Sequence, residues 1–272
     1  MLKLFYITNK PDVARIAQDA GVDRIFVDME YIGKDERQPN MDTVKNHHTV
    51  DDVKNIRRVL DKSELLVRIN PIHKNSQQEI DDVVNAGADI IMLPMWKSAD
   101  DVKRFLGFVN GRVKTTLLLE TDEARKCLDE VLEIDGIDEV HIGLNDLCLS
   151  QKKKFLFELV TDGTVDEISE KLKAKGITFG FGGVGKVGNG DLLPAENILA
   201  EHYRLGSSMV ILSRAFCNSD KVENREEISR IFNEGIAKNR KYEEKLENES
   251  QSYFLQKHKE TAEIISSIVR GK

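Results

Sequence analysis

Eight short apolar runs alternate along the chain with amphipathic segments, and this alternation limits the possible fold more than any other feature. The apolar runs lie at residues 2–7, 25–27, 65–69, 90–93, 115–119, 140–142, 177–181 and 209–212. The segments with helical spacing between them lie at 11–20, 50–60, 77–86, 98–108, 122–132, 165–174 and 196–203. Runs that are apolar throughout, without period-two alternation, are typical of parallel strands covered on both faces.

Eight strand–helix units predict a (β/α)8 TIM barrel, an α/β fold that needs about 250 residues. The chain has 272 residues and therefore has room for one such barrel. Several of the expected helices end at a glycine just before the next strand, as a left-handed C-terminal cap requires. These glycines are Gly21, Gly87, Gly136, Gly176 and Gly206. A doubly wound open sheet is the alternative.

The C-terminal part of the chain is predicted to be helical. The last proline is Pro194, so no later position interrupts a helix through a missing amide proton. From residue 220 to 272 charged residues become dense and apolar residues recur at helical spacing. We therefore expect the barrel to span 1–219. Two amphipathic helices over 220–272 would supply the eighth helix and an element that joins subunits of a homo-oligomer.

Charge and composition exclude several classes of protein. The chain carries 40 Lys and Arg residues against 47 Asp and Glu residues, a formal net charge of −7. This balance argues against binding to nucleic acid or to an anionic membrane, since both need clustered positive charge. Neither an apolar run of bilayer length nor a signal peptide is present, which predicts a cytoplasmic protein. The three cysteines, Cys127, Cys148 and Cys217, are too few and too far apart for a disulfide framework or a Cx2C zinc site.

Polar side chains gather where the predicted strands end. In a (β/α)8 barrel the loops at the C-terminal ends of the strands form the active site, so these side chains are expected to share one site. They occur after the second, third, fifth, sixth and seventh runs. In chain order the residues at these strand ends are Asp28, Glu30 and Tyr31, then Arg68 and Asn70, then Glu120, then Gly143, Asn145 and Asp146. The glycines of 182–185 follow the seventh run.

Glu120 and Asp146 are the candidate metal ligands. Two carboxylates at the ends of adjacent strands suit a hard divalent cation such as Mg²⁺ or Mn²⁺, which keeps positions for water and substrate oxygens. The alternative is that Asp146 caps a turn and Glu120 interacts with the dipole of the next helix. Arg68 could pair with Asp28 or Glu30, or could hold an oxygen of the substrate.

Five segments in order resemble the HpcH/HpaI aldolase/citrate lyase family. Residues 90–100, Ile-Ile-Met-Leu-Pro-Met-Trp-Lys-Ser-Ala-Asp, are similar to its fourth-strand segment. Residues 119–121 (Leu-Glu-Thr) and 141–147 (His-Ile-Gly-Leu-Asn-Asp-Leu) resemble its two metal-bearing segments. Residues 27–30 (Val-Asp-Met-Glu) and 67–70 (Val-Arg-Ile-Asn) resemble its second- and third-strand signatures. The similarity runs from about residue 20 to residue 215.

The resemblance implies a pyruvate-type barrel that acts on 2-oxo acids or on related CoA esters. Glu120 and Asp146 would bind the divalent metal, and Arg68 would face the carbonyl oxygen of the substrate. Backbone amides around Gly143 and Asn145 would hold the substrate carboxylate, with Asp28 and Glu30 also at the substrate. The implied function is a metal-dependent carbon–carbon lyase, an aldolase that forms a pyruvate-type enolate. A CoA-ester lyase or thioesterase, and a relative that binds without catalysis, are the alternatives.

Two positions depart from the family pattern. Tyr31 stands where the family's hydroxy-oxo-acid aldolases have a histidine that transfers protons, so Tyr31 is the candidate for that role. A tyrosine with a pKa near 10 is a poor base at neutral pH. The acid that partners the histidine corresponds to Asn85, at the end of the helix before the fourth strand.

Four further motifs are interpreted as structural or solvent-exposed, without a catalytic role. Residues 180–186 contain the pattern GxGxxG, but they lack the strand–helix context of a dinucleotide-binding loop and the Ser or Thr hydroxyl of a P-loop. We therefore expect these glycines to let the backbone approach a ligand closely, or to turn the chain, and not to bind a nucleotide. Lys186 could still contact an anionic group. His47 and His48 are expected in a solvated loop, His141 in the interior, and Lys152 to Lys154 on a solvated surface.

Overall fold

Eight parallel strands pair in chain order and close a barrel within the residues that the computed structural model describes, 1–33, 48–222 and 224–271. The strands are β1 (Lys3–Ile7), β2 (Arg24–Asp28), β3 (Glu64–Arg68), β4 (Ile90–Leu93), β5 (Lys114–Leu119), β6 (Glu139–Ile142), β7 (Thr178–Val184) and β8 (Met209–Leu212). The predicted (β/α)8 barrel with a C-terminal helical extension is confirmed. The doubly wound sheet is wrong because β1 pairs with β8.

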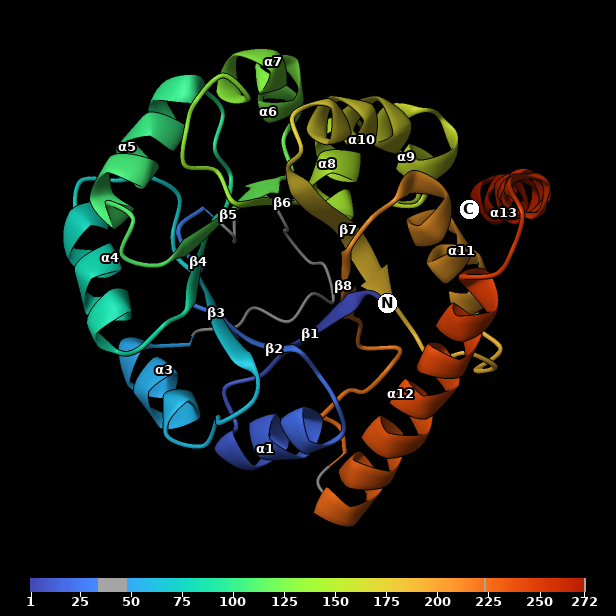
Figure 1. Ribbon diagram of the computed structural model, residues 1–272, viewed down its shortest axis with the longest axis horizontal. Coiled ribbons are helices and arrows are strands. Elements are labelled where there is room, and N and C mark those ends of the chain that lie inside the picture. Colours follow the sequence, from blue (N-terminus) through green and yellow to red (C-terminus); the bar gives the residue numbers. More distant parts are fainter. Residues whose placement is uncertain (34–47, 223, 272) are drawn as a thin grey trace.

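Helices surround the strands, and the last helix of the chain lies outside the ring that the others form (Figure 1). They are α1 (Pro11–Asp19), α3 (Val50–Arg57), α4 (Ser76–Asn85), α5 (Ala99–Val109), α6 (Asp122–Lys126), α7 (Leu128–Val131), α8 (Leu144–Ser150), α9 (Glu158–Thr161), α10 (Thr164–Ala174), α11 (Ala195–Leu205), α12 (Arg225–Leu246) and α13 (Gln251–Arg270). No helix in the described part of the chain is both long enough and apolar enough to cross a membrane.

Helix boundaries follow from local chemistry. The hydroxyls of Thr49, Ser98 and Thr121 accept backbone N–H groups in the first turns of α3, α5 and α6. Such caps satisfy amides that have no partner inside the helix. At the other end of α11, Gly206 has a φ of 73°, a left-handed conformation that suits glycine and ends the helix before β8.

The first helix of the C-terminal segment fills the eighth helical position of the barrel. In Figure 1, α12 lies between α1 and α11, and it contacts both. The Glu243 carboxylate is fully buried and accepts the Leu2 N–H at 2.7 Å, while Arg240 donates to the Leu2 carbonyl at 2.7 Å. Asn239 accepts the Val187 N–H at 2.9 Å and donates to the Gly185 carbonyl at 3.1 Å. Thus α12 holds both the first strand and the segment after β7.

The last helix, α13, packs outside the ring against α11 and α9 (Figure 1). Thr261 and Ile265 are its buried residues, and the Asn197 amide donates to the Thr261 hydroxyl at 3.0 Å. His258 contacts the buried Glu201 carboxylate of α11 at 2.9 Å. The division of the chain at residue 219 and the contact of this segment with another subunit stay predictions.

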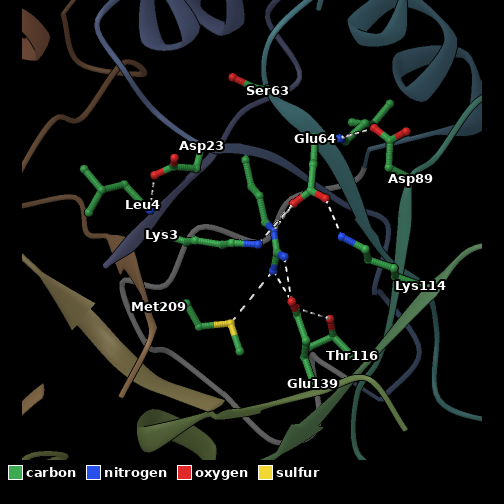
Figure 2. A network of polar contacts seen from close by, with 12 residues as sticks. Lys3, Leu4, Asp23, Ser63, Glu64, Asp89, Lys114, Thr116, Glu139 and Met209 are labelled. Atoms are coloured by element: carbon green, nitrogen blue, oxygen red, sulfur yellow. Dashed lines mark hydrogen bonds and ion pairs between the residues drawn. The ribbon is translucent and has the colours of Figure 1, made fainter. Parts of the chain in front are cut away.

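The interior of the barrel is apolar in its middle and charged at its N-terminal end. The apolar layer consists of Phe5, Phe26, Leu66, Ile90, Met92, Leu118 and Met209. Below it, the fully buried Arg24 donates to Glu139 at 2.5 and 2.7 Å and to Glu64 at 2.7 Å. Figure 2 shows Glu64 and Glu139 on opposite sides of this network, with Lys114 reaching Glu64 at 2.8 Å.

Removing Glu139 should destabilise the barrel strongly, because the fully buried Arg24 would then lose two of its hydrogen bonds. We expect Glu139→Ala to lower the free energy of unfolding by about 3 kcal/mol. Urea unfolding followed by circular dichroism measures this. The control is Glu133→Ala, since Glu133 pairs with Lys175 but is 72% exposed. Equal midpoints for the two variants would contradict the prediction.

The stability of this network should fall in acid. Burial acts to raise the pKa of Glu64, but hydrogen bonds from Lys114 and Arg24 outweigh it and lower the pKa to about 2. A carboxyl with a lowered pKa stabilises the folded state above its unfolded pKa of about 4.3, and the contribution is lost as the pH falls toward 2. We expect about 1–2 kcal/mol between wild type and Glu64→Gln near pH 6, after solvent screening. The difference should shrink by about pH 3, and a constant difference would contradict this account.

Candidate active site

A cavity of about 360 Å³ opens at the C-terminal end of the barrel, on the side opposite the Arg24 network. Inward-facing residues at the ends of the strands line it, as expected for this fold. Its polar lining includes Asp28, Glu30, Arg68, Glu120, His141, Asn145 and Asp146. The volume suits a small-molecule ligand.

Arg68, at the end of β3, is held by two carboxylates from the end of β2. Its guanidinium donates to both oxygens of Asp28 at 2.7 and 2.8 Å and lies 3.3 Å from Glu30 Oε2. The two strands are in register at this point, with Asp28 beside Arg68. Both carboxylates are at most 2% exposed, whereas the Arg68 side chain is 14% exposed toward the cavity. Asp28 and Glu30 therefore orient the guanidinium and keep it charged.

Glu120, directly after β5, is 3% exposed and is oriented by the loop after β4. The Met95 N–H donates to Glu120 Oε1 at 3.0 Å. Met95 has a φ of 52°, which is unusual for a residue with a side chain. This loop conformation turns the amide toward the carboxylate, so backbone strain in one loop positions an acid from the neighbouring strand.

Asp146 lies in the first turn of α8, immediately after β6. Gly143, between β6 and this helix, has no room for a side chain, because a Cβ there would lie 2.8 Å from the Cβ of Glu120. The absence of a Cβ lets the helix approach Glu120. The Gly143 N–H itself donates to the Leu119 carbonyl at 2.9 Å. If amides of this turn hold a ligand carboxylate, they are therefore those that follow Gly143, on Asn145 and its neighbours.

The carboxylates of the site repel one another. Burial, together with the neighbouring charges of Glu30 and Asp146, raises the pKa of Glu120 well above its usual value, although Arg68 acts in the opposite direction. The charged residues that line this cavity are the acids Asp28, Glu30, Glu120, Asp146 and Asp220 and the cations Arg68 and Arg214. An ionised cluster of this composition favours binding of additional positive charge.

Glu120 and Asp146 are the candidate oxygen ligands of a metal ion. Among the residues described, no group of three or more His, Cys, Asp or Glu side chains is arranged to hold a metal ion. Glu120 and Asp146 alone could supply two oxygen ligands, and other positions would have to come from water or ligand oxygens. Mg²⁺ is commonly bound in this way, through one or two carboxylates.

Tyr31, the sequence-based candidate for proton transfer, does not line the cavity and is 56% exposed. The Tyr31 and Ile32 N–H groups both donate to Asn70 Oδ1 at 3.0 Å, so Asn70 fixes the backbone here. The catalytic role of Tyr31 stays a prediction. Asn85 ends α4 just before β4 begins, and so lies at the opposite end of the barrel from the cavity of its own chain.

His48 is closer to the site than the sequence suggested. Its Nδ1 accepts the Asp28 N–H at 3.0 Å, at the end of β2. His47 lies outside the described residues. The glycine-rich segment belongs to β7 and the loop that follows; Gly182 and Gly183 line the cavity, and Lys186 does not.

Residues after β8 also line the cavity and were not singled out from the sequence. They are Ser213, Arg214, Cys217, Asn218, Ser219 and Asp220. The position of these residues could have been predicted as for the other groups, because residues that follow a barrel strand lie at the C-terminal face. Ser213 and Arg214 directly follow the eighth strand. His141, expected as an interior residue, is buried and lines the cavity as well.

The sequence places this site in a known family. A family model described as HpcH/HpaI aldolase/citrate lyase matches residues 2–158, more than half of the chain. The chain therefore belongs to the HpcH/HpaI aldolase/citrate lyase family. The match covers the strands that carry Asp28, Arg68, Glu120 and Asp146 and supports an enzyme of the lyase class. No curated protein matches this chain.

Solved structures share the fold at low sequence identity. An HpcH/HpaI aldolase from Desulfitobacterium hafniense DCB-2 has a TM-score of 0.59 and 15% identity, covering 78% of this chain and 86% of that one. An HpcH/HpaI aldolase/citrate lyase family protein from Burkholderia cenocepacia J2315 has a TM-score of 0.58 and 15% identity, covering 78% and 88%. A variant of the citrate synthase SbnG has a TM-score of 0.57 and 16% identity, covering 88% and 94%.

The strain at Met95 can be measured with a matched pair of variants. Met95→Gly and Met95→Ala remove the same side chain, but only alanine keeps a Cβ in the left-handed region. We expect the glycine variant to be more stable than the alanine variant by about 1 kcal/mol. Thermal and urea unfolding of both proteins give the difference. An alanine variant of equal or greater stability would show that the loop carries no such strain.

Proposed function

We propose that the protein is a divalent-metal-dependent carbon–carbon lyase that cleaves or forms a 2-oxo acid through a pyruvate-type enolate. The observation that carries the proposal is the convergence of Glu120, Asp146 and Arg68 on one cavity at the C-terminal end of the barrel. Membership of a family of aldolases and citrate lyases supports the same class of reaction.

The charge of the site supports a bound cation. Glu120 is buried beside Glu30 and Asp146, and its raised pKa reports the cost of holding these negative charges together. Mg²⁺ or Mn²⁺ would offset that cost, with Glu120 and Asp146 as protein ligands. When bound, such an ion supplies Lewis-acid stabilisation of negative charge on the oxygens of a 2-oxo acid.

Arg68 supplies a cationic group from the protein itself. In a retro-aldol cleavage of a 4-hydroxy-2-oxo acid, a base removes the proton of the 4-hydroxyl, whose oxygen becomes the carbonyl of the departing aldehyde. The C3–C4 bond breaks, and its electron pair forms the C2–C3 double bond of an enolate with negative charge on the C2 oxygen. A guanidinium already oriented by Asp28 and Glu30 can stabilise that oxygen without reorganising. Asp28 and Glu30 thus act by positioning Arg68, since their own oxygens are directed to it.

The proposal predicts that Glu120→Gln weakens metal binding and catalysis together. Glutamine keeps the size of the side chain but removes the charge, so Mn²⁺ affinity should fall by at least about tenfold. Exchange of the C3 protons of pyruvate for deuterium, followed by NMR with Mg²⁺ present, should slow by about 100-fold or more.

The control for this experiment is Glu133→Gln, since the exposed Glu133 pairs with Lys175 at the surface. It should match the wild type in Mn²⁺ affinity and in exchange rate. Unchanged Mn²⁺ binding in Glu120→Gln, or wild-type exchange that survives complete chelation of divalent ions, would refute the proposal.

The same assay separates the alternative functions. A panel that includes a CoA thioester beside pyruvate and a hydroxy-2-oxo acid identifies a CoA-ester lyase or thioesterase by release of free CoA. Saturable binding of pyruvate with Mg²⁺, but without proton exchange or cleavage of any panel member, would identify a non-catalytic binding protein and exclude the lyase.

A further inference from the structure

His141, one of the residues that line the cavity, has a buried ring nitrogen without a hydrogen-bond partner among the residues that the structure describes. In the described part of the chain, five buried side-chain polar atoms have no hydrogen-bond partner, and His141 Nδ1 is one of them. The other four belong to Glu79, Trp96, Ser169 and His202. None of these four residues lines the cavity, whereas His141 does, although it is only 1% exposed.

The tautomer of His141 follows from its single hydrogen bond. The ring Nε2 lies 3.2 Å from the Gly182 carbonyl oxygen. A carbonyl oxygen can only accept, so Nε2 must carry the proton. In the neutral ring Nδ1 is then an unprotonated nitrogen, which can accept a hydrogen bond but cannot donate one.

An irregularity in β7 places the Gly182 carbonyl at this ring. The pairing of β7 with β8 shifts its register between Gly180 and Gly183. Gly182 within the shift has a φ of 51°, and a Cβ there would lie 2.7 Å from Leu144 Cδ1. Glycine is required on both grounds, because the backbone is left-handed and the space is closed. The bulge therefore fixes the position of the Gly182 carbonyl, which selects the tautomer of His141 with the proton on Nε2.

The surroundings keep the His141 ring neutral. Phe5 lies beside it with ring centroids 6.1 Å apart, and Leu118 is its register partner on β5. Burial, together with the charges of Arg24 and Arg68, lowers the pKa of His141 to about 4, although the bond to Gly182 acts in the opposite direction. At neutral pH the ring thus offers the cavity a hydrogen-bond acceptor without charge.

We propose that His141 is a specificity-determining residue, whose Nδ1 accepts a hydrogen bond from a hydroxyl group of the bound ligand. The inference rests on the proposed function only in taking the ligand to be a 2-oxo acid. Ionised carboxylate and carbonyl oxygens are acceptors and cannot satisfy Nδ1, whereas a hydroxyl of a 2-oxo acid can donate to it. A buried acceptor left unpaired disfavours ligands that lack the hydroxyl.

The arrangement also orients the ligand. Arg68, on β3, attracts oxygens that carry negative charge, whereas His141, on β6, repels them and accepts a hydroxyl. The two residues line the same cavity from opposite arcs of the ring of strands. A hydroxylated 2-oxo acid satisfies both in one orientation, with its carboxylate and carbonyl toward Arg68 and its hydroxyl toward His141.

Two substitutions at His141 separate the two ring nitrogens. In His141→Gln the amide can reach the Gly182 carbonyl but leaves no acceptor at the position of Nδ1. In His141→Asn the side-chain oxygen can take the place of Nδ1, while the contact with Gly182 is lost. Circular dichroism and thermal unfolding establish that both variants are folded, and a variant that is unfolded is replaced by His141→Phe.

Calorimetric titration with Mg²⁺ present compares ligands that differ by one hydroxyl: 3-hydroxypyruvate against pyruvate, and 4-hydroxy-2-oxobutanoate against 2-oxobutanoate. We expect wild type to prefer at least one hydroxylated ligand by about tenfold. His141→Gln should lose this preference and His141→Asn should keep part of it. Affinity for the ligands without a hydroxyl should stay within about threefold in both variants.

NMR of the protein labelled with ¹⁵N-histidine gives a readout that does not depend on activity. The His141 resonances, identified by their loss in His141→Gln, should show an unprotonated Nδ1 that shifts on addition of the preferred hydroxylated ligand. A protonated Nδ1 in the free protein would overturn the inference.

The titrations distinguish the two proposals. Pyruvate binding with no preference for a hydroxyl, or a preference that survives in His141→Gln, would overturn the role of His141 and leave the lyase proposal intact. Failure of all four 2-oxo acids to bind would overturn both.

Discussion

The closed ring of eight parallel strands forces inward-facing side chains from neighbouring strands into one narrow space, where each charge has to find its partner among the others. At the N-terminal end this requirement is met, because Arg24 and Lys114 are distributed between Glu139 and Glu64. At the C-terminal end Arg68 pairs with Asp28 and Glu30, and Glu120 is buried so close to Glu30 and Asp146 that their charges raise its pKa. The first end stabilises the barrel, and the second forms the lining of the candidate active site.

Groups that follow strands could be located from the sequence alone. Glu120, Asp146 and Arg68 were predicted together because the closing of parallel strands brings their C-terminal ends to one face, whatever the details of packing. The Arg24 network could not be predicted in the same way. It depends on the register that sets Arg24 beside Glu64 and Thr116 beside Glu139, and register is decided by the whole set of strand pairs.

Single side chains were harder to predict where a backbone irregularity decides their surroundings. Tyr31 follows a strand end as Glu120 does, yet the hydrogen bonds from its backbone to Asn70 leave its ring exposed. His141 was expected to be a satisfied interior residue. Its unpaired nitrogen depends on the bulge in β7 and on the left-handed Gly182, and neither can be deduced from strand spacing.

The hydrogen bonds between Leu2 and α12 join positions 241 residues apart in the chain. The Leu2 backbone beside β1 forms these hydrogen bonds only when Glu243 and Arg240 are present. The segment after β7 likewise needs Asn239 for its own hydrogen bonds. During synthesis, a chain that has not yet produced α12 would therefore lack the hydrogen-bond partners of the Leu2 backbone and of the segment after β7. Until then β1 and β8 could pair, but the partly formed barrel would expose the apolar surface that α12 covers, and such surface is prone to misfolding or to capture by chaperones.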